Sequence, residues 1–170
     1  YSPPAQFPAG FTRVRLINRD PVWHEASILR FRDSTATLER YVAATRTGDE
    51  YPAFAADIGG VSFLAPGDSA DVLINLTPGR YAVVCWHRDH VLQGMGASFE
   101  VVGQEPSRHG LPHAAELPLA DFTVPPLSPV SGHQFLHVTN RGPSEHELAI
   151  LRLAPGKSFE DFMAWRAGGE

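Results

Sequence analysis

The sequence predicts an all-β protein built on a Greek-key β-sandwich with short helices. Short segments in which apolar and polar residues alternate favour strands. The chain also contains 15 glycines and 15 prolines, spread between these segments, which favours tight turns over long helices. With 170 residues the chain is long enough for one sandwich of about 100 residues but short for two complete ones.

Apolar residues recur at every second position of the expected strands, as they do when one face of a sheet is buried. They are Val14 and Leu16, then Ala70, Val72, Ile74 and Leu76, then Tyr81, Val83 and Cys85, and finally Phe99 and Val101. The dipeptides Pro66-Gly67 and Pro78-Gly79 supply turns between the segments. We therefore expect mainly antiparallel pairing.

One segment departs from this alternation. Between Thr37 and Thr45, apolar residues fall at helical spacing, with Leu38, Tyr41 and Val42 on one face. The spacing predicts one short helix there.

The amino-acid composition limits the classes of protein to which the chain can belong. The chain is 43% hydrophobic and 19% charged, which is enough apolar material for an ordinary soluble core. The net charge of −5 is spread along the chain and argues against a nucleic-acid surface. No apolar run approaches the roughly 18 residues of a membrane span. The first four residues, Tyr-Ser-Pro-Pro, lack the apolar core of a signal peptide, so the signal of an exported chain would already have been removed.

An internal repeat indicates how the chain is organised. Residues 18–25 align with residues 140–147 at an offset of about 122 residues, and the register continues through the Ile-Leu-Arg triplets that follow. With a gap of one residue, the expected helix aligns with residues 158–166, where Ser158 and Asp161 resemble a capping box.

The repeat divides the chain into three parts. Residues 1–102 form a complete module, residues 103–120 are a connector rich in Pro, Gly and His, and residues 121–170 are a partial second repeat. The partial repeat lacks counterparts of the strands between Ser62 and Val102. Its apolar residues would face solvent if left unpaired, so we expect it to dock on another surface, with a homodimer through residues 121–170 as the preferred arrangement.

The single cysteine, Cys85, has no partner for an intramolecular disulfide. It opens a Cys-x4-His-x4-Met pattern that continues with His90 and Met95. A thiolate, an imidazole and a thioether are soft and borderline donors that suit copper, provided that a second imidazole comes from elsewhere in the chain. His24, which lies just after an expected strand, is the obvious candidate.

Together these residues resemble the cupredoxin, or blue copper, family. The resemblance covers about residues 10–102, and its landmarks are Asn18, His24, Pro78-Gly79-Arg80-Tyr81, Cys85, His90, Gly94-Met95 and Phe99-Glu100-Val101. It implies one type 1 copper ion per chain, with His24, Cys85 and His90 as close ligands and Met95 as a weak axial ligand. It also implies that Asn18 ties the ligand loops together by hydrogen bonds, and that the protein is a periplasmic or secreted electron carrier.

Some alternatives stay open at this point. His87 competes with His90, because it would share a face with Cys85 if the strand continued. The domain is alternatively a metal-free binding or assembly module, or a component of a larger multicopper protein. An enzyme formed by this chain alone is disfavoured, since the sequence contains no His-x-His pair for a catalytic copper cluster. The sequence does not identify a redox partner.

Overall fold

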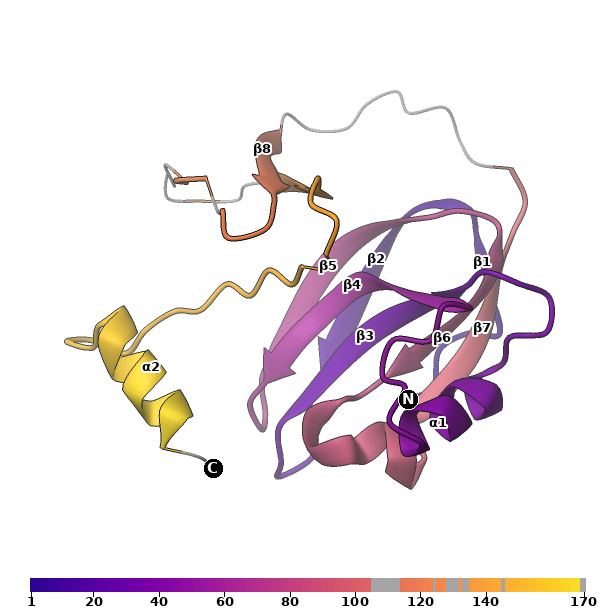
Figure 1. Ribbon diagram of the computed structural model, residues 1–170, viewed down its shortest axis with the longest axis horizontal. Coiled ribbons are helices and arrows are strands. Elements are labelled where there is room, and N and C mark those ends of the chain that lie inside the picture. Colours follow the sequence, from indigo (N-terminus) through magenta and orange to yellow (C-terminus); the bar gives the residue numbers. More distant parts are fainter. Residues whose placement is uncertain (105–113, 124, 128–131, 133–134, 145, 169–170) are drawn as a thin grey trace. The chain divides into compact units, whose positions relative to one another are not determined.

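The computed structural model describes residues 1–104, 114–123, 125–127, 132, 135–144 and 146–168. The chain divides into two units, Tyr1–Leu111 and Pro112–Glu170. Figure 1 shows the elements of both units along the colour scale of the sequence.

The first unit contains two sheets. The larger sheet has five strands in the order β1-β7-β6-β3-β4, and the smaller sheet pairs β2 with β5. All pairs are antiparallel except β1 with β7. The strands are β1 (Gln6–Pro8), β2 (Gly10–Ile17), β3 (His24–Phe31), β4 (Ala55–Leu64), β5 (Ser69–Leu76), β6 (Gly79–Val84) and β7 (Gly96–Val102). The β-sandwich predicted for this part of the chain is confirmed.

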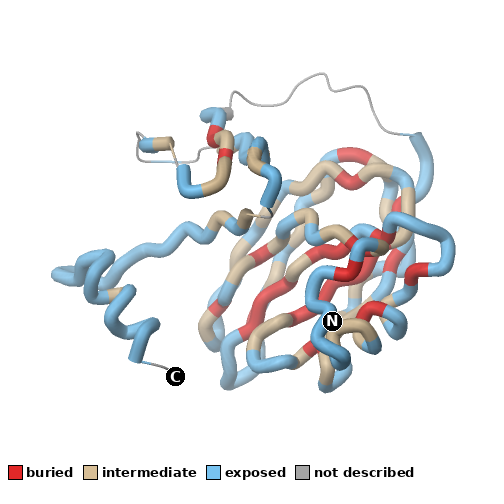
Figure 2. The backbone as a smooth tube through the Cα atoms, in the orientation of Figure 1, coloured by how far each residue is buried: buried red, intermediate tan, exposed pale blue. Residues whose placement is uncertain are grey.

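The main core fills the space between the two sheets. Strand β2 points Val14 and Leu16 toward this core and leaves Arg13 and Arg15 exposed, as the alternation predicted. The buried members come mostly from the larger sheet: Ala26, Ile28, Val61, Leu76, Tyr81, Val83, Phe99 and Val101. In Figure 2 the buried positions are concentrated along these strands.

A second core covers the opposite face of the larger sheet. It packs the sheet against helix α1 (Leu38–Arg46) and the 3-10 helix η1 (His87–Gln93). Its buried members are Leu29, Phe31, Ala36, Tyr41, Ala55, Ala82, Val84 and Val91. Strand β6 is therefore buried on both faces, whereas the sequence pattern indicated a strand buried on one face only.

Helix α1 begins and ends close to the predicted residues. The side chain of Thr37 caps the helix by accepting the backbone N–H of Arg40 at 3.1 Å. Arg46 lies in the last turn, where a positive charge stabilises the helix dipole. The predicted helix is confirmed.

The second unit contains strand β8 (Ala114–Leu119), which pairs in parallel with β9 (Phe135–Asn140), and helix α2 (Phe159–Ala167). Strand β8 lies inside the predicted connector, of which residues 105–113 fall outside the described residues. The predicted capping box is confirmed, because Ser158 and Asp161 exchange side-chain and backbone hydrogen bonds of 2.8 and 3.2 Å. No helix in the described parts of the chain is long and apolar enough to cross a membrane.

One loop of the second unit repeats the hydrogen bonds of a loop in the first. The Asn18 side chain donates to the carbonyl of Val22 at 2.7 Å, and Asn140 donates to that of Ser144 at 2.6 Å. In both loops the asparagine Oδ1 accepts the backbone N–H two residues further on, at 3.0 and 2.9 Å. Residues 146–153, which align with β3, form no strand. The partial second repeat therefore stays a prediction.

Candidate metal centre

Two neighbouring strands bring the predicted site residues to one end of the sandwich. Cys85 directly follows β6, and His24 is the first residue of β3. Strands β3 and β6 pair antiparallel with Ser27 opposite Val84, so the start of one lies beside the end of the other. His90 comes from η1, which continues the chain after Cys85.

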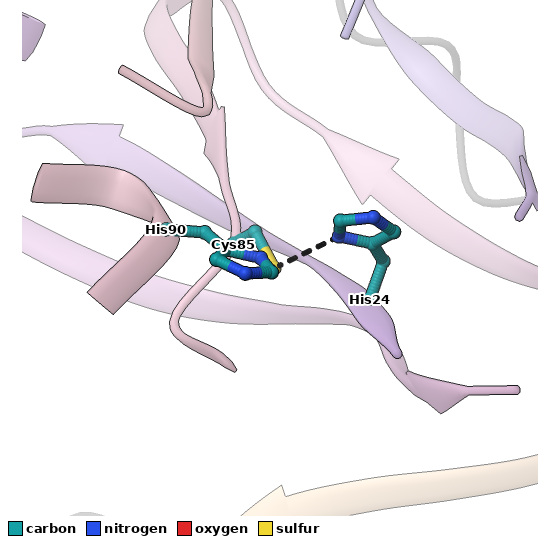
Figure 3. Close-up of side chains that lie close together, drawn as sticks. All are labelled: His24, Cys85 and His90. Atoms are coloured by element: carbon teal, nitrogen blue, oxygen red, sulfur yellow. Dashed lines mark hydrogen bonds between the residues drawn. The ribbon is translucent and has the colours of Figure 1, made fainter. Parts of the chain in front are cut away.

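The three side chains converge on one point. Cys85 Sγ lies 3.7 Å from His24 Nδ1 and 3.5 Å from His90 Nδ1. One ligand atom from each residue lies within 4.8 Å of the other two, and Figure 3 shows the side chains turned toward one another. Cys85 is completely buried, His24 is 6% exposed, and His90 is half-buried.

These separations fit ligands of a single metal ion. Bonds from a metal to an imidazole nitrogen and a thiolate sulfur, about 2.1 and 2.3 Å long and meeting at about 110–120°, place the two donors about 3.6–3.8 Å apart. Of the two Cys85 distances, 3.7 Å lies within this range and 3.5 Å lies 0.1 Å below it. One thiolate and two imidazoles are thus placed as a metal would require.

A tight reversal after β6 turns His90 back toward Cys85. The carbonyl oxygen of Cys85 accepts the backbone N–H of Val91 at 2.8 Å, which closes the loop. Within it, Arg88 and Asp89 adopt left-handed conformations with φ of 46° and 58°. Non-glycine residues adopt such angles uncommonly, so the reversal carries local backbone strain.

His87 occupies a different position. Strand β6 ends at Val84, so the condition under which His87 would share a face with Cys85 is not met. Among the described residues, the cluster of three potential ligands comprises His24, Cys85 and His90. The His87 ring instead packs edge-on against His90, with ring centres 5.4 Å apart, and against Phe63 at 5.7 Å.

Met95 is held beside the site through its backbone. Its carbonyl accepts the N–H of Cys85 at 3.2 Å, and its own N–H donates to the carbonyl of His90 at 2.9 Å. The preceding Gly94 has a φ of 95°, a left-handed conformation that favours glycine and ends η1. The role of Met95 as a fourth ligand stays a prediction.

Asp20 contacts the His24 ring at the nitrogen that does not face Cys85. Its Oδ2 lies 3.0 Å from His24 Nε2. A carboxylate at that distance accepts a hydrogen bond from an Nε2–H group, and in this tautomer the lone pair for a metal is on Nδ1, the nitrogen that faces Cys85. Sequence reasoning missed this residue, although an aspartate four residues before a candidate ligand histidine is a visible signal.

Asn18 and Glu25 share the role that was expected of Asn18 alone. The buried Asn18 side chain donates to the carbonyls of Val22 and Leu64, at 2.7 and 2.9 Å, and so fixes the loop before His24 to the end of β4. The link to the Cys85 loop comes from Glu25, whose Oε1 accepts the backbone N–H of Trp86 at 2.8 Å. Sequence reasoning missed Glu25, an acidic residue within a largely apolar strand.

No protein-family model matches the chain, and no curated protein matches it closely enough to count as a relative. Among solved structures, auracyanin B is 20% identical, with 58% of this chain and 76% of that chain covered and a TM-score of 0.43. Auracyanin from Roseiflexus castenholzii is 19% identical, with 58% and 85% covered and a TM-score of 0.39.

Rusticyanin from Thiobacillus ferrooxidans is 18% identical, with 57% of this chain and 59% of that chain covered and a TM-score of 0.40. Structural similarity at these sequence identities and TM-scores does not support an assignment of function. The function of the chain is therefore inferred from the geometry of His24, Cys85 and His90.

Proposed function

We propose that the first unit is a type 1 copper protein that transfers single electrons. The observation that carries this proposal is the convergence of Cys85 Sγ with the Nδ1 atoms of His24 and His90. Two imidazoles and a thiolate in one plane, with a weak thioether, form the donor set of blue copper sites. Met95, held beside Cys85 and His90 by backbone hydrogen bonds, supplies the thioether.

Copper held there, one ion per chain, supplies the one-electron chemistry by alternating between Cu(II) and Cu(I). The residues of the chain exclude water and keep the donors in place. Cys85 is completely buried and His24 nearly so, while His90 is the most exposed of the three. A site held by a sheet and a closed loop changes little when the metal charge changes, which favours fast electron transfer.

This function needs no substrate pocket, and we propose an electron carrier rather than an enzyme. A metal-free binding module and a component of a larger multicopper protein are the competing functions. A preorganised donor set with a buried thiol favours the copper carrier over the metal-free module. We place the protein in the periplasm or outside the cell, as the sequence resemblance to cupredoxins implies.

Residues 121–170 form, in this proposal, the contact between two copies of the chain. Their exposed apolar side chains support it: Phe122, Phe135, Ile150 and Phe159 are 106%, 43%, 73% and 61% exposed. An apolar surface of this kind is a strong driver of association.

The function is tested by adding Cu(II) to the purified, metal-free protein and recording the visible spectrum. The expected result is an intense thiolate-to-copper charge-transfer band in the red region that saturates at one copper ion per chain. A spectrum with only the weak absorption of loosely bound Cu(II) would exclude the type 1 site. Zn(II), which occupies the same kind of donors without colour, serves as the competitor that should block the band.

A further inference from the structure

Among the described residues, β5 is the only strand that pairs with β2, so one edge of β2 has no neighbouring strand. The core beside β2 is incompletely covered. Val14 and Leu16 point toward the core between the two sheets, yet both are only half-buried. A further strand beside β2 would cover these side chains and pair the free backbone groups of the edge.

Strand β9, the counterpart of β2 in the predicted repeat, has such a neighbour. The offset of about 122 residues aligns β9 (Phe135–Asn140) with residues 13–18, most of which belong to β2. Strand β9 pairs in parallel with β8, and Leu117 of β8 lies opposite Val138 of β9. The position on β2 that corresponds to Val138 is Leu16.

Backbone hydrogen bonds indicate which edge of β9 carries β8. Neighbouring residues of a strand direct their N–H groups to opposite edges. The N–H of Asn18 points toward the side of β5, where it donates to the carbonyl of Asp68 at 3.0 Å. Arg141, the counterpart of Arg19, donates its N–H to the carbonyl of Leu119 in β8 at 2.8 Å. Strand β8 therefore occupies the edge of β9 that corresponds to the unpaired edge of β2.

The side chains of β8 match those beside the unpaired edge. In the register that it has on β9, β8 would place Leu117 beside Leu16 of β2. Glu116 would come beside Arg15, whose side chain is 57% exposed. On β9 the residue opposite Glu116 is His137, with Nδ1 at 2.9 Å from Oε1. Because an arginine is always charged and a histidine is charged only when protonated, β2 offers the better ionic partner.

Strand β8 pairs through one edge only. The carbonyl of Leu119 faces β9, so the neighbouring Pro118 directs its backbone groups to the opposite edge. Proline has no N–H, and it is tolerated where a strand needs no ladder bond. Strand β8 would therefore bind β2 through the edge that it uses on β9, and it would leave β9 to do so.

We propose that two copies of the chain exchange their β8 strands, each of which adds in parallel to the unpaired edge of β2 in the other copy. Exchange of one element between two copies is a low-cost route to a dimer. An antiparallel contact between two β2 edges is disfavoured, because Arg13 and Arg15 would face the same arginines of the other copy. The exchange adds to the proposed contact through residues 121–170 and does not depend on copper.

A disulfide between the two strands tests the exchange. Arg15→Cys in one full-length chain and Glu116→Cys in a second, isotope-labelled chain replace two exposed side chains. Directly opposite residues of neighbouring strands lie within disulfide reach. Arg13→Cys with Glu116→Cys is the matched control, because two residues along a strand add about 6.6 Å and take the Cα atoms beyond that reach. The native Cys85 is completely buried and does not compete.

The two chains are unfolded, mixed, refolded together under reducing conditions and then oxidised, and mass spectrometry identifies the product. We expect a dimer that links the two variants, while the control pair gives only a trace. Equal yields from both pairs overturn the exchange. A chain that carries both Arg15→Cys and Glu116→Cys should also be linked between molecules. A link within one molecule means that the strand comes from the same copy, which overturns the exchange.

Reversal of a charge gives an independent readout. Arg15→Glu should weaken self-association about tenfold, because like charges come to lie opposite each other on both exchanged strands. Adding Glu116→Arg in the same chain should restore it. Arg13→Glu is the control and should leave the dimerisation constant near the wild-type value. Light scattering over a range of concentrations measures the constants, and equal weakening by Arg13→Glu and Arg15→Glu overturns the exchange.

Other failures have different signatures. A wild-type chain that dimerises, but whose variants form no link between positions 15 and 116, overturns the exchange and leaves the contact through residues 121–170. A monomeric wild-type chain overturns both contacts. The copper function is tested separately by the visible spectrum, so its failure is distinguishable from either result.

Discussion

The Oε1 atom of Glu25 accepts the backbone N–H of Trp86 at 2.8 Å, which joins the residue after His24 to the residue after Cys85. The Glu25 side chain is 6% exposed. Two candidate ligands that lie far apart in the sequence are therefore held together by a bond between their immediate neighbours.

Glu25→Ala should destabilise the metal-free protein by about 1–3 kcal/mol, because a partly buried N–H loses its acceptor. Glu25→Gln keeps a side-chain oxygen at the same place, so this variant should lose clearly less stability than Glu25→Ala. Urea denaturation of the two variants and the wild type measures the difference. Equal losses in both variants would show that the charge of Glu25, rather than its role as an acceptor, determines stability.

Cys85→Ser should abolish the charge-transfer band, because a hydroxyl does not replace a thiolate as the strong donor. Met95→Leu removes only the weak thioether and should shift the band without removing it. Visible spectra at equal copper loading compare the two variants. Full colour in Cys85→Ser would contradict the assignment of the site.

The two histidines of η1 should behave differently. His90→Ala should disrupt copper binding, since it removes one of the three clustered donors. His87→Ala should leave the absorption nearly unchanged, because the His87 ring packs beside His90 without joining the cluster. Copper titrations followed by absorbance give the affinity of each variant. The reverse outcome would transfer the ligand role to His87.

Gly60 allows the close approach of β4 to β3. A Cβ added at Gly60 would overlap the backbone oxygen of Ala26, two residues after His24. Because backbone has little freedom to move within a sheet, Gly60→Ala should destabilise the protein by about 3 kcal/mol or more.

Gly96→Ala is the comparison for this substitution. A Cβ there meets the methyl carbons of Leu38 at 3.1 and 3.3 Å, which a side-chain rotation relieves. The substitution should therefore destabilise the protein by only about 1 kcal/mol. Thermal denaturation of both variants measures the contrast, and similar midpoints would show that β3 and β4 separate more easily than the close contact implies.

The fold of the first unit was largely predictable because its signals are local. The alternation of Val14 and Leu16 with exposed arginines predicts β2, and the helical spacing after Thr37 predicts α1. The burial of β6 on both faces was not predictable, since it depends on α1 and η1 packing against the sheet. Alternation of apolar and polar residues indicates that one face of a strand is buried. It does not indicate that a helix covers the other face.

The candidate ligand residues were visible in the sequence, whereas the residues that hold the ligand loops in place were less so. Cys85, His90 and Met95 lie on one short segment, so their spacing was visible. The contacts of Glu25 with Trp86 and of Asn18 with Leu64 join segments that only the folded sheet brings together. Such long-range pairs leave no periodicity in a single sequence.

The partial second repeat leads to the last prediction. Residues 146–153 align with β3, the strand that lies between β4 and β6 in the first unit, yet they form no strand. Ile150 and Leu151 in this segment are 73% and 51% exposed. Exposed apolar side chains of this kind favour association with another chain.

We expect the 170-residue chain to form a dimer in solution and a chain that ends at Val102 to be monomeric. Light scattering of both, measured over a range of concentrations, gives their molar masses. Ile150→Asp in the full chain should shift the equilibrium toward monomer, because a charge is costly to bury in an apolar contact. If both chains are well-behaved monomers, residues 121–170 do not mediate self-association. In that case their apolar side chains are covered by something other than a second copy.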